Sequence, residues 1–85
     1  MAAVIELAGY LGWRHYHTHD SRRSSAGFPD LVLVRGDRLM FVELKSERGK
    51  VSKEQDEWLD ALRATGIEAK VYRPSEWAAI ERRLR

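Results

Sequence analysis

The sequence predicts an α/β domain in which helices flank a small mixed β-sheet, with the elements in the order αβββαβα. Segments with helical periodicity alternate with short apolar runs of the kind that form strands. The two central runs are separated only by Gly36-Asp37, which is a signal for a two-residue hairpin turn. We expect residues 1–85 to form a single domain, because a chain of this length supports one modest core.

The first half of the chain predicts one helix and one strand. A helix is expected over residues 1–11, and Gly12 suits the position after its end. Aromatic and alternating residues predict a strand over 13–18, and a polar loop follows over 20–27. The apolar stripe of the helix would consist of Val4, Ile5, Ala8 and Leu11.

The second half begins with the hairpin and continues into two helices and a further strand. Strands are predicted over 31–34 and 39–45, and 67–72 reads as a half-buried strand that ends before Pro74. A helix is expected to begin at Ser52, which has capping-box spacing to Gln55, and to close at Gly66. A last short helix would be capped by Ser75. The inward residues of the two helices would be Trp58, Leu59 and Leu62, and Trp77, Ile80 and Leu84.

Composition excludes several classes of protein. The 15 basic and 13 acidic side chains give a net charge of +2, which points only weakly to nucleic acid. Without cysteine there is no disulfide framework and no thiolate metal site. The apolar runs are too short to span a bilayer, and the N-terminus does not read as a signal peptide, so a cytoplasmic location is expected. A domain this small is marginally stable, which makes a homodimer plausible.

The hairpin register predicts that two acidic residues meet. If the turn holds two residues, Asp30 lies directly opposite Glu43, with Cβ atoms roughly 5 Å apart. Both would share a sheet face with Lys45 and with apolar residues that need a covering helix. These apolar residues are Val32, Val34, Leu39 and Phe41.

Like charges at this distance repel, so either one carboxyl is protonated or a cation lies between them. A hard cation such as Mg²⁺ prefers oxygen ligands, and one or two carboxylates with water and phosphate suffice. Two acids, a metal and Lys45 would suit water attack on a phosphodiester, because the metal polarises the phosphate and the lysine orients water or offsets charge. In the alternative, Asp30 simply begins a strand while Glu43 pairs with Lys45.

These residues resemble the motif of the PD-(D/E)XK nuclease superfamily. Pro29-Asp30 followed by Glu43-Leu44-Lys45 carries the resemblance. The longer strings GFPDLVLV and FVELKSERGKVSKEQ resemble the VRR-NUC branch of that superfamily, and the likeness extends over nearly the whole chain. The resemblance implies a restriction-endonuclease-like core.

The resemblance also implies a Mg²⁺- or Mn²⁺-dependent deoxyribonuclease. Asp30 and Glu43 would bind the metal with the Leu44 carbonyl, Lys45 would serve the attacking water, and Gln55 would border the site. Gln55 could equally bond back to Ser52 as a helix cap. Small members of this branch resemble phage-encoded proteins, tend to be dimers, and in some cases act on four-way DNA junctions, so a bacterial or phage-infected cell is the expected setting.

The chain departs from the family pattern in its first helix. The family supplies another acid roughly three turns before the Gly-Trp pair, and that position would fall ahead of Met1. Glu6 is the nearest acid, but it lies opposite the apolar stripe and is expected to face solvent.

Two further groups of residues have both a functional and an ordinary interpretation. His15, His17 and His19 alternate and could bind a transition metal, although such histidines more often pack or contact a substrate. The candidates for binding DNA phosphates could equally be ordinary surface residues. They are Arg22, Arg23, Ser24, Ser25, Lys50 and Lys53.

Three functions remain open from the sequence. The first is a metal-dependent endodeoxyribonuclease that acts as a dimer on branched or four-way-junction DNA. The second is a non-catalytic nucleic-acid-binding module on the same fold, which the missing first-helix acid motivates. The third is a dimeric interaction protein with neither activity.

Overall fold

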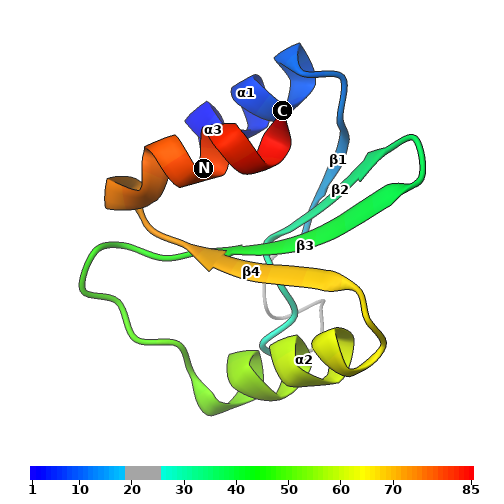
Figure 1. Ribbon diagram of the computed structural model, residues 1–85. Helices are drawn as coiled ribbons and strands as arrows, with labels where there is room; N and C mark the ends of the chain where they lie inside the picture. Colours follow the sequence, from blue (N-terminus) through cyan, green and yellow to red (C-terminus); the bar gives the residue numbers. More distant parts are fainter. Residues whose placement is uncertain (19–25) are drawn as a thin grey trace.

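The structure is a computed structural model that describes residues 1–18 and 26–85. It consists of a four-stranded mixed β-sheet with helices on both faces. Helices α1 and α3 lie together on one face of the sheet and α2 lies on the other (Figure 1). The predicted fold class and element order are confirmed, with one added 3-10 turn. The elements are α1 (Ala2–Tyr10), β1 (Arg14–His17), β2 (Leu31–Arg35), β3 (Arg38–Leu44), α2 (Lys53–Ala64), β4 (Glu68–Tyr72), η1 (Pro74–Glu76) and α3 (Trp77–Leu84).

The strands lie in the order β1-β2-β3-β4. The first three are antiparallel, and β4 runs parallel to β3 after the α2 crossover. The predicted hairpin register is confirmed, since Arg35 pairs with Arg38 and Leu31 pairs with Val42. Gly36 has a φ of +59°, a conformation that glycine adopts without strain.

The core lies between the sheet and the helices α1 and α3. Alternate strand residues point into it, which explains the alternation in the sequence. On the opposite face α2 covers only part of the sheet, because Val34 remains 39% exposed. The expectation that a helix covers this whole face is therefore wrong at that end. The buried core residues contributed by the two central strands are Leu31, Leu33, Met40 and Val42.

The segment Gly27–Asp30 is packed between the sheet and α2. Phe28 makes edge-to-face contacts with Phe41 and Trp58, at centroid distances of 5.8 and 5.0 Å. Pro29 is fully buried. The sequence GFPD therefore fixes where Asp30 enters the sheet.

Gly27 lies so close to α2 that no side chain fits there. A Cβ atom at this position would lie 2.4 Å from the carbonyl carbon of Glu54, and φ is +85°. Gly27→Ala is therefore expected to destabilise the protein by about 2–4 kcal/mol, since overpacking adds to backbone strain. Gly36→Ala is the matched control, with a positive φ but open space, and should cost about 1–2 kcal/mol. Urea denaturation measures both losses, and equal losses would show that the contact with α2 is unimportant.

The start of the last helix differs from the prediction. Ser75 does not cap it, because Ser75 lies inside the 3-10 turn and its hydroxyl donates to Glu47 Oε2 at 2.9 Å. Trp77 was expected to face inward, but it is 39% exposed, since it forms the first turn of α3 at the edge of the core. Ile80 and Leu84 are buried as expected.

The hairpin end and Trp13 hold the C-terminus of α3. Trp13 Nε1 and Arg35 Nη1 both donate to the Leu84 carbonyl at 2.8 Å. The guanidinium groups of Arg35 and Arg38 lie 4.6 and 4.9 Å from the Trp13 ring centroid. Positive charges near the C-terminus of a helix interact favourably with the helix dipole. These contacts also join the end of α3 to the sheet.

Candidate active site

Asp30 lies at the entrance to β2, where two neighbouring strands hold it. Its Oδ2 accepts the Leu44 N–H at 2.8 Å, which ties the side chain to the end of β3. The backbone oxygen of Asp30 accepts the Thr18 N–H at 2.8 Å, and the Thr18 hydroxyl donates to the Pro29 carbonyl at 2.6 Å. The acid is therefore fixed on both its side-chain and its backbone sides.

Glu43 is the buried acid of the site and is only 3% exposed. Its Oε2 accepts the Gln55 Nε2–H at 2.8 Å and lies 3.7 Å from Lys45 Nζ. Its Oε1 is buried without a hydrogen-bond partner among the described residues. A buried carboxylate oxygen without a partner is costly, so this atom marks a place where an additional ligand would be stabilising.

Burial raises the pKa of Glu43 from its ordinary value of 4.5 to about 7. The negative charge of Asp30 contributes to this rise, and the Lys45 ammonium opposes both effects. Strongly shifted carboxyl groups are common at functional sites, because the environment is arranged around one protonation state. The predicted repulsion between the two acids is thus present.

Lys45 follows directly after β3, and its side chain is 19% exposed. Its backbone N–H donates to the Tyr72 carbonyl at 3.0 Å, so β4 fixes the position of its Cα atom. The ion pair of Lys45 with Glu43 was the ordinary alternative to a catalytic role. The structure shows this pair, but it also leaves Glu43 Oε1 unpaired, which a simple ion pair does not explain.

Gln55 both caps the start of α2 and contacts Glu43, as its two predicted positions require. Its Oε1 accepts the Ser52 N–H at 2.8 Å, and its own N–H donates to Ser52 Oγ at 3.1 Å, which completes a capping box. The remaining amide nitrogen reaches Glu43. The start of α2 is therefore connected directly to the buried acid.

Gln55→Ala is expected to lower any metal-dependent cleavage by about 10–100-fold, the usual cost of losing a group that orients a metal ligand. Ser52→Ala is the matched control, because it removes the other half of the capping box and leaves the Glu43 bond intact. Both variants should lose about 1 kcal/mol of stability. Equal cleavage rates for the two would contradict a role for Gln55 in the site.

The residues present fit a hard divalent cation. Asp30 and Glu43 supply carboxylate oxygens, and the Leu44 carbonyl points to the same strand edge as the Leu44 N–H that Asp30 accepts. Across residues 1–18 and 26–85, no group of three His, Cys, Asp or Glu side chains is arranged to bind a metal. Glu6 is exposed, as expected, so two acids and one carbonyl are the ligands that these residues offer.

The candidate DNA-binding residues divide into two groups. Lys50 and Lys53 are exposed near the start of α2, although Glu54 and Asp56 in the first turn of that helix oppose phosphate binding there. Arg22, Arg23 and Ser24, together with Ser25, lie outside the described residues. Both groups remain predictions.

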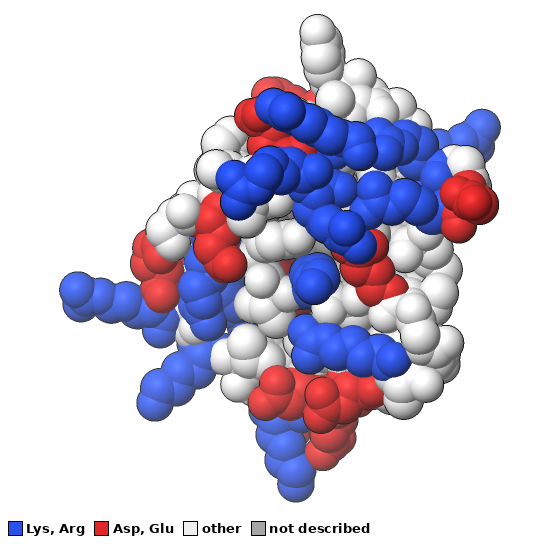
Figure 2. Space-filling model, in the orientation of Figure 1, with Lys and Arg blue, Asp and Glu red and all other residues white. Residues whose placement is uncertain are grey.

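Charge is unevenly distributed over one face of the molecule. Lys and Arg side chains gather over the upper half of the view, where α3 lies, and acidic side chains gather at the lower end, where α2 lies (Figure 2). Part of this basic surface is internally paired, because Arg83 bonds Glu68 and Arg85 bonds Glu81. The interpretation of the C-terminal arginines as surface charge agrees with these pairs.

The histidines form no metal centre in the part of the chain that the structure describes. His15 and His17 are exposed on β1, and neither belongs to a three-residue ligand group there. His19 lies outside the described residues. The histidine trio therefore remains a prediction, because one of its members is not described.

One supporting residue, Thr18, was not predicted from the sequence. Thr18 holds Pro29 and Asp30 through two hydrogen bonds, but in the sequence it is an ordinary strand-end threonine. Thr18 follows β1, and Asp30 precedes β2. The sequence could have pointed to Thr18 only if the pairing of β1 with β2 were known.

The fold, together with the sequence motif at Asp30, Glu43 and Lys45, is that of the PD-(D/E)XK nuclease superfamily. The family model of the VRR-NUC domain matches residues 4–76. The chain belongs to the VRR-NUC family.

A solved structure that the chain resembles is that of Archaeoglobus fulgidus Hjc, a Holliday junction resolvase from an archaeal hyperthermophile. The TM-score is 0.61, the sequences are 25% identical, and the match covers 86% of this chain and 63% of the Hjc chain. This chain therefore spans less than two thirds of the length of Hjc. No curated protein sequence matches the chain. In the described part of the structure, no helix is long and apolar enough to cross a membrane.

Proposed function

We propose that this chain is a metal-dependent endodeoxyribonuclease that hydrolyses phosphodiester bonds at Asp30, Glu43 and Lys45. The observation that carries the proposal is Glu43, which is 3% exposed and keeps one carboxylate oxygen without a partner beside a second acid and a lysine. In an ordinary structural ion pair, we would expect each carboxylate oxygen of Glu43 to accept a hydrogen bond or to be exposed to water. A divalent cation would bind the free oxygen and relieve the repulsion between the acids.

Each residue would have a separate task in the reaction. A bound Mg²⁺ or Mn²⁺ would polarise the scissile phosphate and lower the pKa of the attacking water. Asp30 and Glu43, with the Leu44 carbonyl, would hold that ion. The Lys45 ammonium would orient the water or offset the charge that develops on the phosphate. Gln55 would hold Glu43 in the orientation that binding requires.

Four-way-junction DNA is the substrate that we favour. Hjc, which is similar in fold over most of this chain, is a Holliday junction resolvase. Resolving a junction requires cuts in two strands related by approximate two-fold symmetry, so the active form would be a homodimer with two equivalent sites. A bacterial or phage-infected cell, where such junctions arise, is the setting that we propose.

Cleavage of matched DNA substrates tests the proposal. A synthetic four-way junction and linear duplexes of the same sequences are incubated with the protein and Mg²⁺, Mn²⁺ or a chelator. We expect paired cuts in the junction with either metal, no cutting with chelator, and no cutting by Asp30→Asn. Light scattering under the same conditions should give the mass of a dimer.

One observation favours a second candidate, a non-catalytic module that binds nucleic acid. The described residues offer only two acids for the metal, and Glu6 faces solvent. Salt-dependent DNA binding without metal-dependent cutting would favour this second function. If the protein neither binds nor cuts DNA, the third possibility, a dimeric interaction protein, is favoured.

A further inference from the structure

The loop over residues 46–51 connects two groups that both contact Glu43. Lys45 precedes the loop, and its Nζ lies 3.7 Å from Glu43 Oε2. Gln55 lies in the helix that follows, and its Nε2 lies 2.8 Å from the same oxygen. The loop therefore joins the two side chains that approach Glu43 Oε2.

The side chain of Arg73 holds this loop by bonding to the backbone of the loop. The residue follows β4, and its Nη1 donates to the carbonyl oxygens of Ser46 at 2.6 Å and Gly49 at 2.7 Å. The same nitrogen lies 3.4 Å from the Glu47 carbonyl. Hydrogen bonds from a charged donor are stronger than neutral ones, and here three carbonyls converge on one cationic nitrogen.

A second contact joins the same two segments in the opposite direction. The Glu47 carboxylate accepts hydrogen bonds from the Ser75 backbone N–H and from the Ser75 hydroxyl. Loop carbonyls thus accept hydrogen bonds from Arg73, and the carboxylate of the loop residue Glu47 accepts hydrogen bonds from Ser75. We call these contacts between residues 46–49 and 73–75 the loop clamp.

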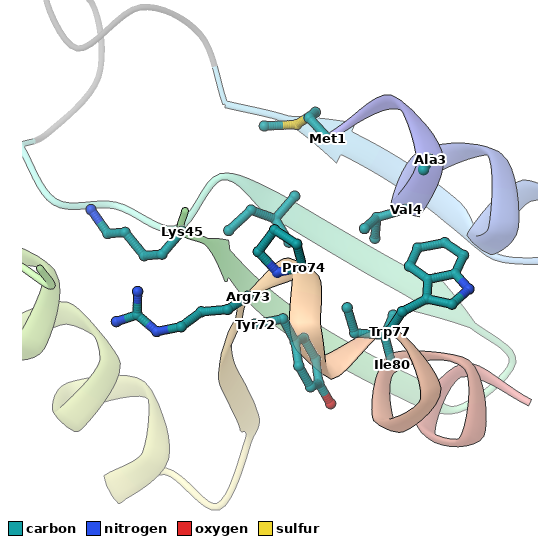
Figure 3. Close-up of a pocket in the computed structure, with 10 residues that line it drawn as sticks. Met1, Ala3, Val4, Lys45, Tyr72, Arg73, Pro74, Trp77 and Ile80 are labelled. Carbon is teal, nitrogen blue, oxygen red and sulfur yellow. The ribbon is translucent and has the colours of Figure 1, made fainter. Parts of the chain in front are cut away.

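The loop clamp bears directly on Lys45. A Cβ atom built on Gly49 would lie 3.7 Å from Lys45 Cδ and 2.8 Å from Ser46 Oγ, so Gly49 is a near neighbour of the lysine side chain. Lys45 and Arg73 line the same pocket, and both side chains extend toward the same side of it, away from Trp77 (Figure 3). Moving the loop would therefore change the surroundings of the Lys45 side chain.

We propose that Arg73 is a positioning residue for the cleavage reaction, which fixes Lys45 through the loop clamp. The inference rests on the proposed nuclease function. Because Nη1 is bonded to loop carbonyls, we expect Arg73 to act on the reaction through the loop and Lys45.

Kinetics of two Arg73 variants test the inference. Arg73→Gln is expected to lower kcat by about 10–100-fold and to change KM by less than about threefold, since the DNA contacts remain. Arg73→Lys should recover much of the rate, because a lysine ammonium also places several donors on one nitrogen. Arg63→Gln is the matched control. It removes a guanidinium bond to the Ala69 carbonyl far along α2, and should leave kcat unchanged.

A double-mutant cycle separates positioning from general destabilisation. If Arg73 acts through Lys45, adding Arg73→Gln to Lys45→Met should cause no further loss beyond that of Lys45→Met alone. Losses that multiply, a KM increase that accounts for the whole effect, or full activity of Arg73→Gln would each overturn the inference.

Hydrogen exchange gives a readout that needs no activity. Amides over residues 46–51 should exchange faster in Arg73→Gln than in the wild type, and those in Arg63→Gln should not. Unchanged exchange would overturn the loop clamp. A wild type that cuts no DNA would overturn the proposed function and the inference with it, whereas a wild type that cuts no faster than Arg73→Gln overturns the inference alone.

Discussion

Replacing Lys45 by methionine is expected to lower the cleavage rate by about 10²–10³-fold while DNA binding changes little. The Lys45 ammonium lies 3.7 Å from Glu43 Oε2, and methionine keeps an unbranched side chain of similar length without the charge. The loss would therefore report the charge and not the packing. Cleavage under single-turnover conditions and DNA binding with Ca²⁺ in place of Mg²⁺ measure the two quantities separately.

The control for this change is Lys70→Ala, because Lys70 is exposed on β4 and has no place in the proposed site. Lys45 also opposes the raised pKa of Glu43, so its removal should move metal binding to higher pH. The Lys45→Met variant is therefore assayed at pH 7 and at a higher pH. Activity at the higher pH equal to that of the wild type would refute the role assigned to Lys45.

Glu43→Gln is expected to abolish metal-dependent cleavage and, without metal, to raise stability at pH 8. Burial raises the pKa of Glu43 to about 7, so between pH 4.5 and 7 the folded protein holds a proton that the unfolded chain has released. The stability from that proton is complete below pH 4.5 and is lost as pH rises through about 7. A shift of this size corresponds to on the order of 3 kcal/mol.

A neutral glutamine has no such pH dependence. With chelator, the free energy of unfolding of the wild type should fall relative to that of Glu43→Gln between pH 4.5 and pH 8. Added Mn²⁺ should reverse the order at pH 8, since the cation stabilises only the protein that binds it. Urea denaturation at several pH values measures both effects. A Glu43→Gln protein that is less stable than the wild type at pH 8 with chelator would contradict this description of the site.

Local patterns predicted the features that depend on short stretches of chain. Gly36-Asp37 defined the hairpin register, which is confirmed up to the Leu31–Val42 pair, and continuing it by one pair predicts Asp30 opposite Glu43. The capping-box spacing of Ser52 and Gln55 predicted the start of α2. These features follow from turn chemistry and alternation, which act over a few residues.

Features that depend on contacts between distant segments were not predicted. Arg73 clamps a loop that lies 24–27 residues earlier, and Ser75 binds Glu47 and does not cap a helix. Trp77 was expected in the core because its helical spacing matches Ile80, but the 3-10 turn before it leaves it at the surface. The contacts of Arg73 and Ser75 required knowledge that the β4 end lies beside the β3–α2 loop, which no periodicity reveals.

Anomalous diffraction from crystals grown with Mn²⁺ tests the central claim most directly, because Mn²⁺ gives a signal that water and lighter ions lack. We expect one strong anomalous peak between the Asp30 and Glu43 carboxylates, within bonding distance of Glu43 Oε1 and the Leu44 carbonyl. If the peak lies elsewhere, or if Glu43 Oε1 gains a protein donor in a well-ordered site without manganese, the proposed metal site is wrong.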